Sequence, residues 1–148
     1  MNIRKYQHAD KEQCLEIFHK NVGQFFTLDE LPFFDLWLEN SDNYPYFVVE
    51  MDGHVVACGG IYYDERFAMA GLSWGMVDPE YQRQGIGRKL TEFRIKQICK
   101  AFPGTPCFIQ TTKHAAGFYT KLGFTLKEVK RNRSTEGQDW YFLEYPAA

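Results

Sequence analysis

The stretch MVDPEYQRQGIGRKL, residues 76–90, joins the end of an apolar run to a polar turn, two glycines and the start of an amphipathic helix. Glycine has no side chain that would keep a ligand away, and the first turn of a helix exposes unpaired amides at the positive end of the helix dipole. Arg83, Arg88 and Lys89 add positive charge at the same place. The stretch therefore predicts a site for a diphosphate group.

Two common phosphate-binding motifs do not match these letters. A dinucleotide fingerprint needs a third glycine at position 90, where this chain has Leu90. An ATP-type phosphate loop needs the pattern G-x-x-x-x-G-K-[ST], which the chain lacks. Gly85 and Gly87 taken alone are also compatible with a turn that binds nothing.

The elements expected around this stretch alternate between strand and helix. Period-two apolar runs and turn residues predict strands at 3–7, 46–51, 55–63, 66–77, 107–111, 124–130 and 140–145, and helical spacing predicts helices at 9–22, 28–40, 85–102 and 114–122. Asp52-Gly53 is a strong hairpin signal, and a polar turn is expected at 134–139. This order indicates an α+β fold with a partly parallel sheet.

Length and composition exclude several classes of protein. The 148 residues, 45% of them hydrophobic, suffice for one domain spanning 1–148, and no stretch approaches the roughly 18 apolar residues of a membrane span. Seventeen Lys and Arg against nineteen Asp and Glu give a net charge of −2, so neither nucleic acid nor a membrane surface is an expected partner. The four cysteines form no C-x-x-C pair, which favours reduced thiols and a cytoplasmic location.

Two segments together resemble a known family. QRQGIG, residues 82–87, resembles the acyl-CoA pyrophosphate motif of the GNAT superfamily of N-acetyltransferases, and AAGFYTKLGF, residues 115–124, is similar to a second segment of that superfamily. The resemblance implies the acyl-CoA N-acyltransferase fold: a central mixed sheet of about seven strands, splayed in the middle and flanked by about four helices. It also implies acetyl-CoA as the acyl donor and a primary amine of a small molecule or peptide as the acceptor.

The same resemblance implies which residues hold the donor. Backbone groups of Met76 and Val77 would pair with the pantetheine arm, and amides of residues 84–88 would bind the pyrophosphate, while the Ile86 side chain would point into the core. The strands ending at Val77 and beginning near Cys107 would splay apart to leave a slot for the thioester. The full set of expected cofactor-binding residues is Met76, Val77, Gln82, Arg83, Gln84, Gly85, Ile86, Gly87, Arg88, Thr112 and Tyr119.

Tyr119 matches the family position commonly assigned as general acid. A phenol has a reference pKa near 10, so Tyr119 starts protonated at neutral pH and can donate to the CoA thiolate as it leaves. The alternative is a tyrosine that only packs its ring and binds the CoA sulfur or a water molecule.

The chain departs from the family pattern at two places. Thr112 stands where many members have an asparagine that contacts the pantetheine, and residues 70–75 contain no carboxylate where some members place a catalytic glutamate. We therefore expect a water chain to carry the proton of the amine to an acid elsewhere on the sheet, first Glu50, then Asp64 or Glu65. The alternative for all three is an ordinary solvated charge.

The remaining conspicuous residues give weaker indications. His8, His19 and His54 lack clustered ligands, so no metal is expected, and Cys107 is interpreted as a small buried apolar residue. His114 either contacts CoA or is solvated at a helix start. Phe25 and Phe26 are candidate substrate-binding residues near the junction of the first two helices, with core packing as the alternative. A homodimer, a non-catalytic acyl-CoA sensor and a nucleotide-binding protein remain open.

Overall fold

A computed structural model of the chain describes residues 1–131 and 139–146. Within these residues the strands are β1 (Asn2–Lys5), β2 (Tyr46–Met51), β3 (His54–Asp64), β4 (Met69–Val77), β5 (Cys107–Thr111), β6 (Thr125–Lys130) and β7 (Trp140–Tyr145). The helices are α1 (Lys11–Lys20), α2 (Leu31–Glu39), α3 (Ile86–Ala101) and α4 (Lys113–Lys121), with short 3-10 turns η1 (His8–Asp10), η2 (Leu28–Glu30) and η3 (Pro79–Tyr81). The predicted order of strands and helices is confirmed.

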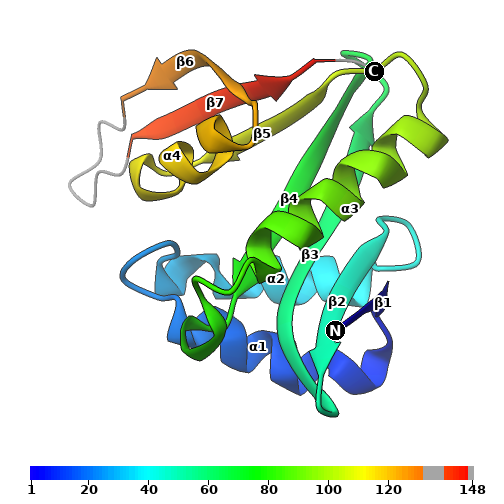
Figure 1. The fold of residues 1–148 in the computed structure, drawn as a ribbon, viewed down its shortest axis with the longest axis vertical. Coiled ribbons are helices and arrows are strands. Elements are labelled where there is room, and N and C mark those ends of the chain that lie inside the picture. The colour runs from blue at the N-terminus through cyan, green and yellow to red at the C-terminus, as the bar shows by residue number, and fades with distance from the viewer. Residues whose placement is uncertain (132–138, 147–148) are drawn as a thin grey trace.

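The sheet is mixed and has the strand order β1-β2-β3-β4-β5-β7-β6. The β2–β3 hairpin turns through Asp52 and Gly53, which both have positive φ, as a two-residue turn of this type requires. Alternate residues of β2 face opposite layers: Tyr46 and Val48 pack with α1 and α2, whereas Phe47 and Val49 pack in the core that includes α3 and α4. Helices therefore cover both faces of the sheet (Figure 1).

Several element boundaries differ from the sequence-based expectation. The helix expected at 9–22 is split into η1 and α1 and ends at Lys20, which leaves Val22 36% exposed beyond the helix. The strand expected from residue 66 begins at Met69, because Asp64 accepts from the backbone amide of Arg66 at 3.0 Å and holds a turn there. The turn predicted at 134–139 lies outside the described residues except for Asp139.

β4 and β5 form the one parallel pair of the described sheet, and they separate after a short paired stretch. β4 and β5 are paired only at Ala70 with Cys107 and Gly71 with Phe108, near the start of each strand. Beyond these two pairs the strands diverge, so the half of the sheet containing β5, β6 and β7 swings away from β4 (Figure 1). The expected splay is therefore present, and it exposes an edge of β4 in the middle of the sheet.

β4 also contains a bulge at the level of this opening. Met76 pairs with Cys58 and Ser73 with Gly60, so Trp74 and Gly75 have no partner of their own on β3. Trp74 has a φ of 44°, which is uncommon for a bulky side chain, and its carbonyl accepts from the Tyr46 hydroxyl at 2.7 Å. Such local strain is typical of functional sites.

No helix of the described residues is long and apolar enough to cross a bilayer.

Candidate active site

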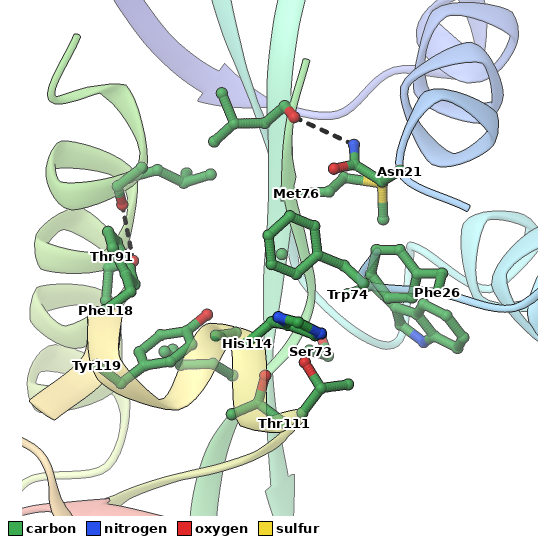
Figure 2. A pocket seen from close by; sticks show the side chains of 18 of the residues that line it. Asn21, Phe26, Ser73, Trp74, Met76, Thr91, Thr111, His114, Phe118 and Tyr119 are labelled. Atoms are coloured by element: carbon green, nitrogen blue, oxygen red, sulfur yellow. Dashed lines mark hydrogen bonds between the residues drawn. The ribbon is translucent and has the colours of Figure 1, made fainter. Parts of the chain in front are cut away.

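A cavity of about 750 Å³ fills the opening between β4 and β5. Its walls come from the exposed edge of β4, the end of β5 and the starts of α3 and α4, and the segment between α1 and α2 closes another side. Figure 2 shows Tyr119 extending from α4 into this space, with Trp74 and Phe26 on the opposite side. A cavity of this size is typical of small-molecule and cofactor sites.

One end of the cavity is the start of α3, where the diphosphate was expected. Arg83 has a φ of 66° and Gly85 a φ of 80°, so the turn before the helix is left-handed at two positions. Lys89 donates its amide to the Gly85 carbonyl, and no protein acceptor within the described residues binds the amides of residues 86–88. Three donors at the positive end of the helix dipole are thus available to an anion.

Gly87 keeps this helix start accessible. Its carbonyl accepts from the Thr91 hydroxyl at 2.8 Å, and a Cβ added to it would lie 3.4 Å from both Phe118 Cζ and Val77 Cγ2. The neighbouring Ile86 is 3% exposed and packs in the core, as expected. A Cβ at position 87 would make ordinary van der Waals contact with both Phe118 and Val77, so a branched or longer side chain there would fill the space beside the helix start.

The exposed edge of β4 presents backbone groups to the cavity. The amide of Asp78 donates to the Val56 carbonyl, so alternation along the strand turns the backbone groups of Val77 toward the opening. The side-chain amides of Asn21 and Gln82 donate to the Val77 carbonyl at 3.1 and 3.3 Å (Figure 2 draws the first). The Val77 carbonyl is thus already occupied, whereas its N–H faces the opening and is the group a strand-like ligand would meet.

Tyr119 is the buried phenol of the site. It is 7% exposed, and its ring makes edge contacts with Phe118 and Phe124 at centroid distances of 5.0 and 5.4 Å. Burial raises the pKa of Tyr119 above its usual value of 10.0, although the positive charge of Arg94 opposes this shift. Tyr119 is therefore protonated at neutral pH and can act as a proton donor.

Thr112 and His114 line the cavity at the start of α4. The Thr112 side chain is 4% exposed and its Oγ1 is buried without a protein partner, which suits a ligand that supplies a hydrogen bond. No group of three or more His, Cys, Asp or Glu side chains within residues 1–131 and 139–146 is arranged to hold a metal ion.

The structure brings most of the predicted cofactor residues to one cavity. Of these, Ile86 and Gln84 alone do not line it; Gln84 lies in the turn before α3, and Ile86 is the first residue of that helix. Phe25 and Phe26 also line it, and Phe26 stacks on Trp74 at a centroid distance of 5.8 Å. The lining residues from the predicted set are Met76, Val77, Gln82, Arg83, Gly85, Gly87, Arg88, Thr112 and Tyr119.

The three predicted proton acceptors do not reach the cavity. Glu50 lies on β2 and accepts from the Arg4 guanidinium at 2.9 Å, while Asp64 pairs with Arg66 at 3.0 Å and Glu65 lies in the adjoining turn. None of them lines the opening between β4 and β5. Sequence order placed them on the sheet, but the cavity lies on the other side of β4.

Asn21, Glu30 and Arg94 are among the polar residues that line the cavity without having been expected from the sequence. Glu30 ends η2, and burial raises its pKa above the usual 4.5 while a contact from Thr27 opposes the shift. Asn21 caps the end of α1, and Arg94 lies within α3 and is only 2% exposed. Glu30 ends the segment T-L-D-E before an apolar helix, which signals a helix start but not a pocket, and no motif covers Arg94 or Asn21.

Comparisons with known proteins agree with this geometry. A model described as "Acetyltransferase (GNAT) domain" matches residues 42–126, more than half of the chain. The [ribosomal protein bS18]-alanine N-acetyltransferase of Escherichia coli strain K12 is 37% identical over 67 residues, and the match covers 43% of this chain and less than half, 45%, of that relative.

Solved structures match over nearly the whole chain. The crystal structure of the ribosomal-protein-alanine N-acetyltransferase of Brucella melitensis has a TM-score of 0.80 at 23% identity, covering 99% of both chains, and therefore shows the fold alone. The crystal structure of the ribosomal-protein-S18-alanine N-acetyltransferase of Escherichia coli has a TM-score of 0.78 at 25% identity, covering 99% of this chain and 94% of that one.

Replacing Gly87 with valine tests the predicted diphosphate site. Acetyl-CoA at 100 times its dissociation constant should stabilise the native protein by about 2.7 kcal/mol, measured as a rise in melting temperature. Gly87→Val should abolish this rise, because the new side chain fills the space beside Phe118 and Val77. Gly117→Val is the matched control in α4, where an added Cβ meets nothing within 4 Å. An undiminished rise in Gly87→Val would place the diphosphate elsewhere.

Proposed function

This chain belongs to the GNAT acetyltransferase family, and from that premise we propose that it transfers an acetyl group from acetyl-CoA to a primary amine by direct attack in a ternary complex. One observation carries the proposal: a single cavity joins the open start of α3 to the buried, protonated Tyr119 through the exposed edge of β4. The helix start suits the pyrophosphate, the β4 edge suits the pantetheine, and a protonated Tyr119 in the same cavity suits a donor to the leaving thiolate.

The proposed reaction has one bond-forming and one bond-breaking event. The neutral amine attacks the thioester carbonyl carbon, a C–N bond forms, and collapse of the tetrahedral intermediate breaks the C–S bond. Tyr119 donates its proton to the sulfur, so CoA leaves as a thiol, and the phenol is recharged from solvent. The excess proton on the attacking nitrogen must pass to a base.

We assign that base to Glu30 in place of the residues expected from the sequence. Glu30 is the one carboxylate of the described residues that lines the cavity, and it belongs to the same segment between α1 and α2 as Phe25 and Phe26. A carboxylate with a raised pKa is a stronger base than an ordinary one, and an anion there also attracts an ammonium group. Glu30 would therefore attract the amine electrostatically and, once the neutral amine has attacked, accept the excess proton of the nitrogen, directly or through water.

The acceptor is proposed at the level of its chemistry. Relatives named as alanine N-acetyltransferases of ribosomal protein S18 favour a peptide amine as one candidate, and a small-molecule amine is the other. An α-amine has a pKa near 8 against about 10.4 for a lysine side chain, so a larger fraction of it is neutral at pH 7.

Thiol release tests the proposed activity. The protein is incubated with acetyl-CoA and a panel of amines that includes a peptide beginning with alanine, free amino acids and polyamines, and acetylated products are identified by mass spectrometry. Amine-dependent release of CoA thiol with a matching product supports the proposal. Binding of acetyl-CoA without release across the panel would favour a sensor, and protection by ATP or NAD but not by CoA would favour a nucleotide-binding protein.

Replacing Tyr119 with phenylalanine keeps the ring and its packing but removes the proton donor. We expect turnover to fall by roughly 10² to 10⁴, with little change in the affinity for acetyl-CoA. Tyr81→Phe is the control, because this tyrosine does not line the cavity. A turnover within a few-fold of the native value in Tyr119→Phe would exclude the acid role.

Replacing Glu30 with glutamine should remove a pH dependence. With saturating acceptor, native turnover should rise as pH passes the elevated pKa of Glu30, because only the ionised carboxylate accepts a proton. Glu30→Gln should lower turnover by roughly 10² and lose this rise. Asp29→Asn alters the adjacent carboxylate, which does not line the cavity, and should leave the profile unchanged. An unaltered pH profile in Glu30→Gln would mean that solvent takes the proton.

A further inference from the structure

Arg94 is a polar residue of the cavity that the transfer mechanism does not use. Its side chain is 2% exposed, and the guanidinium lies against the β3 and β4 backbones. A Cβ at Gly59 would stand 2.9 Å from Arg94 Cζ, and one at Gly75 would stand 2.7 Å from Nη2. Both strands thus carry glycine where any side chain would collide with the guanidinium, so this part of the sheet accommodates a buried cation.

The protein does not compensate the charge of Arg94. Nη1 donates to the carbonyls of Gly60 and Ser73 at 3.3 and 3.4 Å, longer than the usual range for such bonds, and Nε is buried without a partner. No carboxylate of residues 1–131 or 139–146 forms an ion pair with it. An arginine stays charged in proteins, and burying a charge without a counter-charge is costly.

The uncompensated cation borders the cavity close to the reacting groups. Arg94, Ser73 and Gly75 line the same space as Tyr119, and the charge of Arg94 is near enough to act on the Tyr119 phenol. The Ser73 hydroxyl is a second buried polar atom without a partner. An anion entering here would find guanidinium donors and a hydroxyl beside the place of the thioester.

We propose that Arg94 forms a carboxylate subsite, and that the substrate carries a carboxylate a few bonds from the reacting carbon. The planar fork of a guanidinium matches a carboxylate in geometry and charge. This inference rests on the proposed acyl transfer and names its substrate class. Two sources supply the same chemistry: the carboxylate of an amine acceptor such as a free α-amino acid, or the end of a short dicarboxylic acyl chain on CoA.

The experiment compares matched substrates in the native protein and in Arg94→Met. The acceptor arm pairs α-amino acids with their amides under acetyl-CoA, and the donor arm pairs malonyl- and succinyl-CoA with acetyl- and butyryl-CoA. In one of the two arms, the native protein should have a higher kcat/KM for the carboxylate-bearing substrate than for its neutral partner. Arg94→Met should reduce this preference by about 10- to 100-fold. Dividing the preference of the native protein by the preference of Arg94→Met cancels the intrinsic reactivity of each amine or thioester. Lys96→Met removes an exposed cation from the same helix and should leave the preference unchanged.

A binding readout keeps the two proposals distinguishable. Amino acids are added to the native protein with CoA bound, and the acyl-CoA esters are added alone; the carboxylate-bearing ligands should raise the melting temperature more than their neutral partners. This difference should vanish in Arg94→Met, and persist in part in Arg94→Lys. Such a difference without turnover would uphold the subsite and reject the transfer.

Two results would overturn the carboxylate subsite. In the first, the native protein has the same kcat/KM and the same rise in melting temperature for carboxylate-bearing ligands and for their neutral partners. This result counts against the subsite even where acetyl transfer itself is observed. The other is a uniform loss of kcat in Arg94→Met for every substrate, since Arg94 would then act through Tyr119 alone. If Arg94→Met does not fold, the comparison of ligands in the native protein decides.

Discussion

The short pairing of β4 with β5 is the constraint on which the site depends. Two residue pairs hold the strands together at their starts, and beyond them the edge of β4 has no neighbouring strand. An unpaired strand edge inside a sheet is a template for another extended chain. The bulge at Trp74, in the ladder between β3 and β4, lies beside this opening, and the open start of α3 follows the end of β4, so backbone geometry contributes strongly to the shape of the proposed cofactor site.

The cavity also concentrates polar groups that the fold leaves unsatisfied. Thr112, Ser73 and Arg94 all have buried polar atoms without protein partners, and all three line it. Such groups reduce the stability of the free protein and are expected where a ligand supplies the missing partners. Burial in the same cavity also raises the pKa values of Tyr119 and Glu30, because it disfavours the charged form of each group.

The sequence predicted the elements of the fold, and most residues expected to bind the donor line one cavity, whereas the expected proton acceptors do not line it. The motif at 82–87 and the helix holding Tyr119 are local patterns, and they meet at one cavity because they follow β4 and β5, the two strands on either side of the opening. Glu50 does not line the cavity, because it lies on β2 and pairs with Arg4, whereas the opening lies beyond β4, and the sequence alone does not give the strand order. Arg94 occupies an apolar-looking face of α3, and its burial follows from Gly59 and Gly75, which are distant from it in the chain.

Amide hydrogen exchange of the protein with and without acetyl-CoA tests the central claim most directly, because that claim concerns backbone amides. The account expects acetyl-CoA to slow exchange at Val77 and at residues 84–88, with little change along β1 and β2, which lie at the far edge of the sheet. Slowed exchange elsewhere, with no protection at Val77 or the start of α3, would contradict the assignment of the β4 edge and the α3 start as the cofactor site.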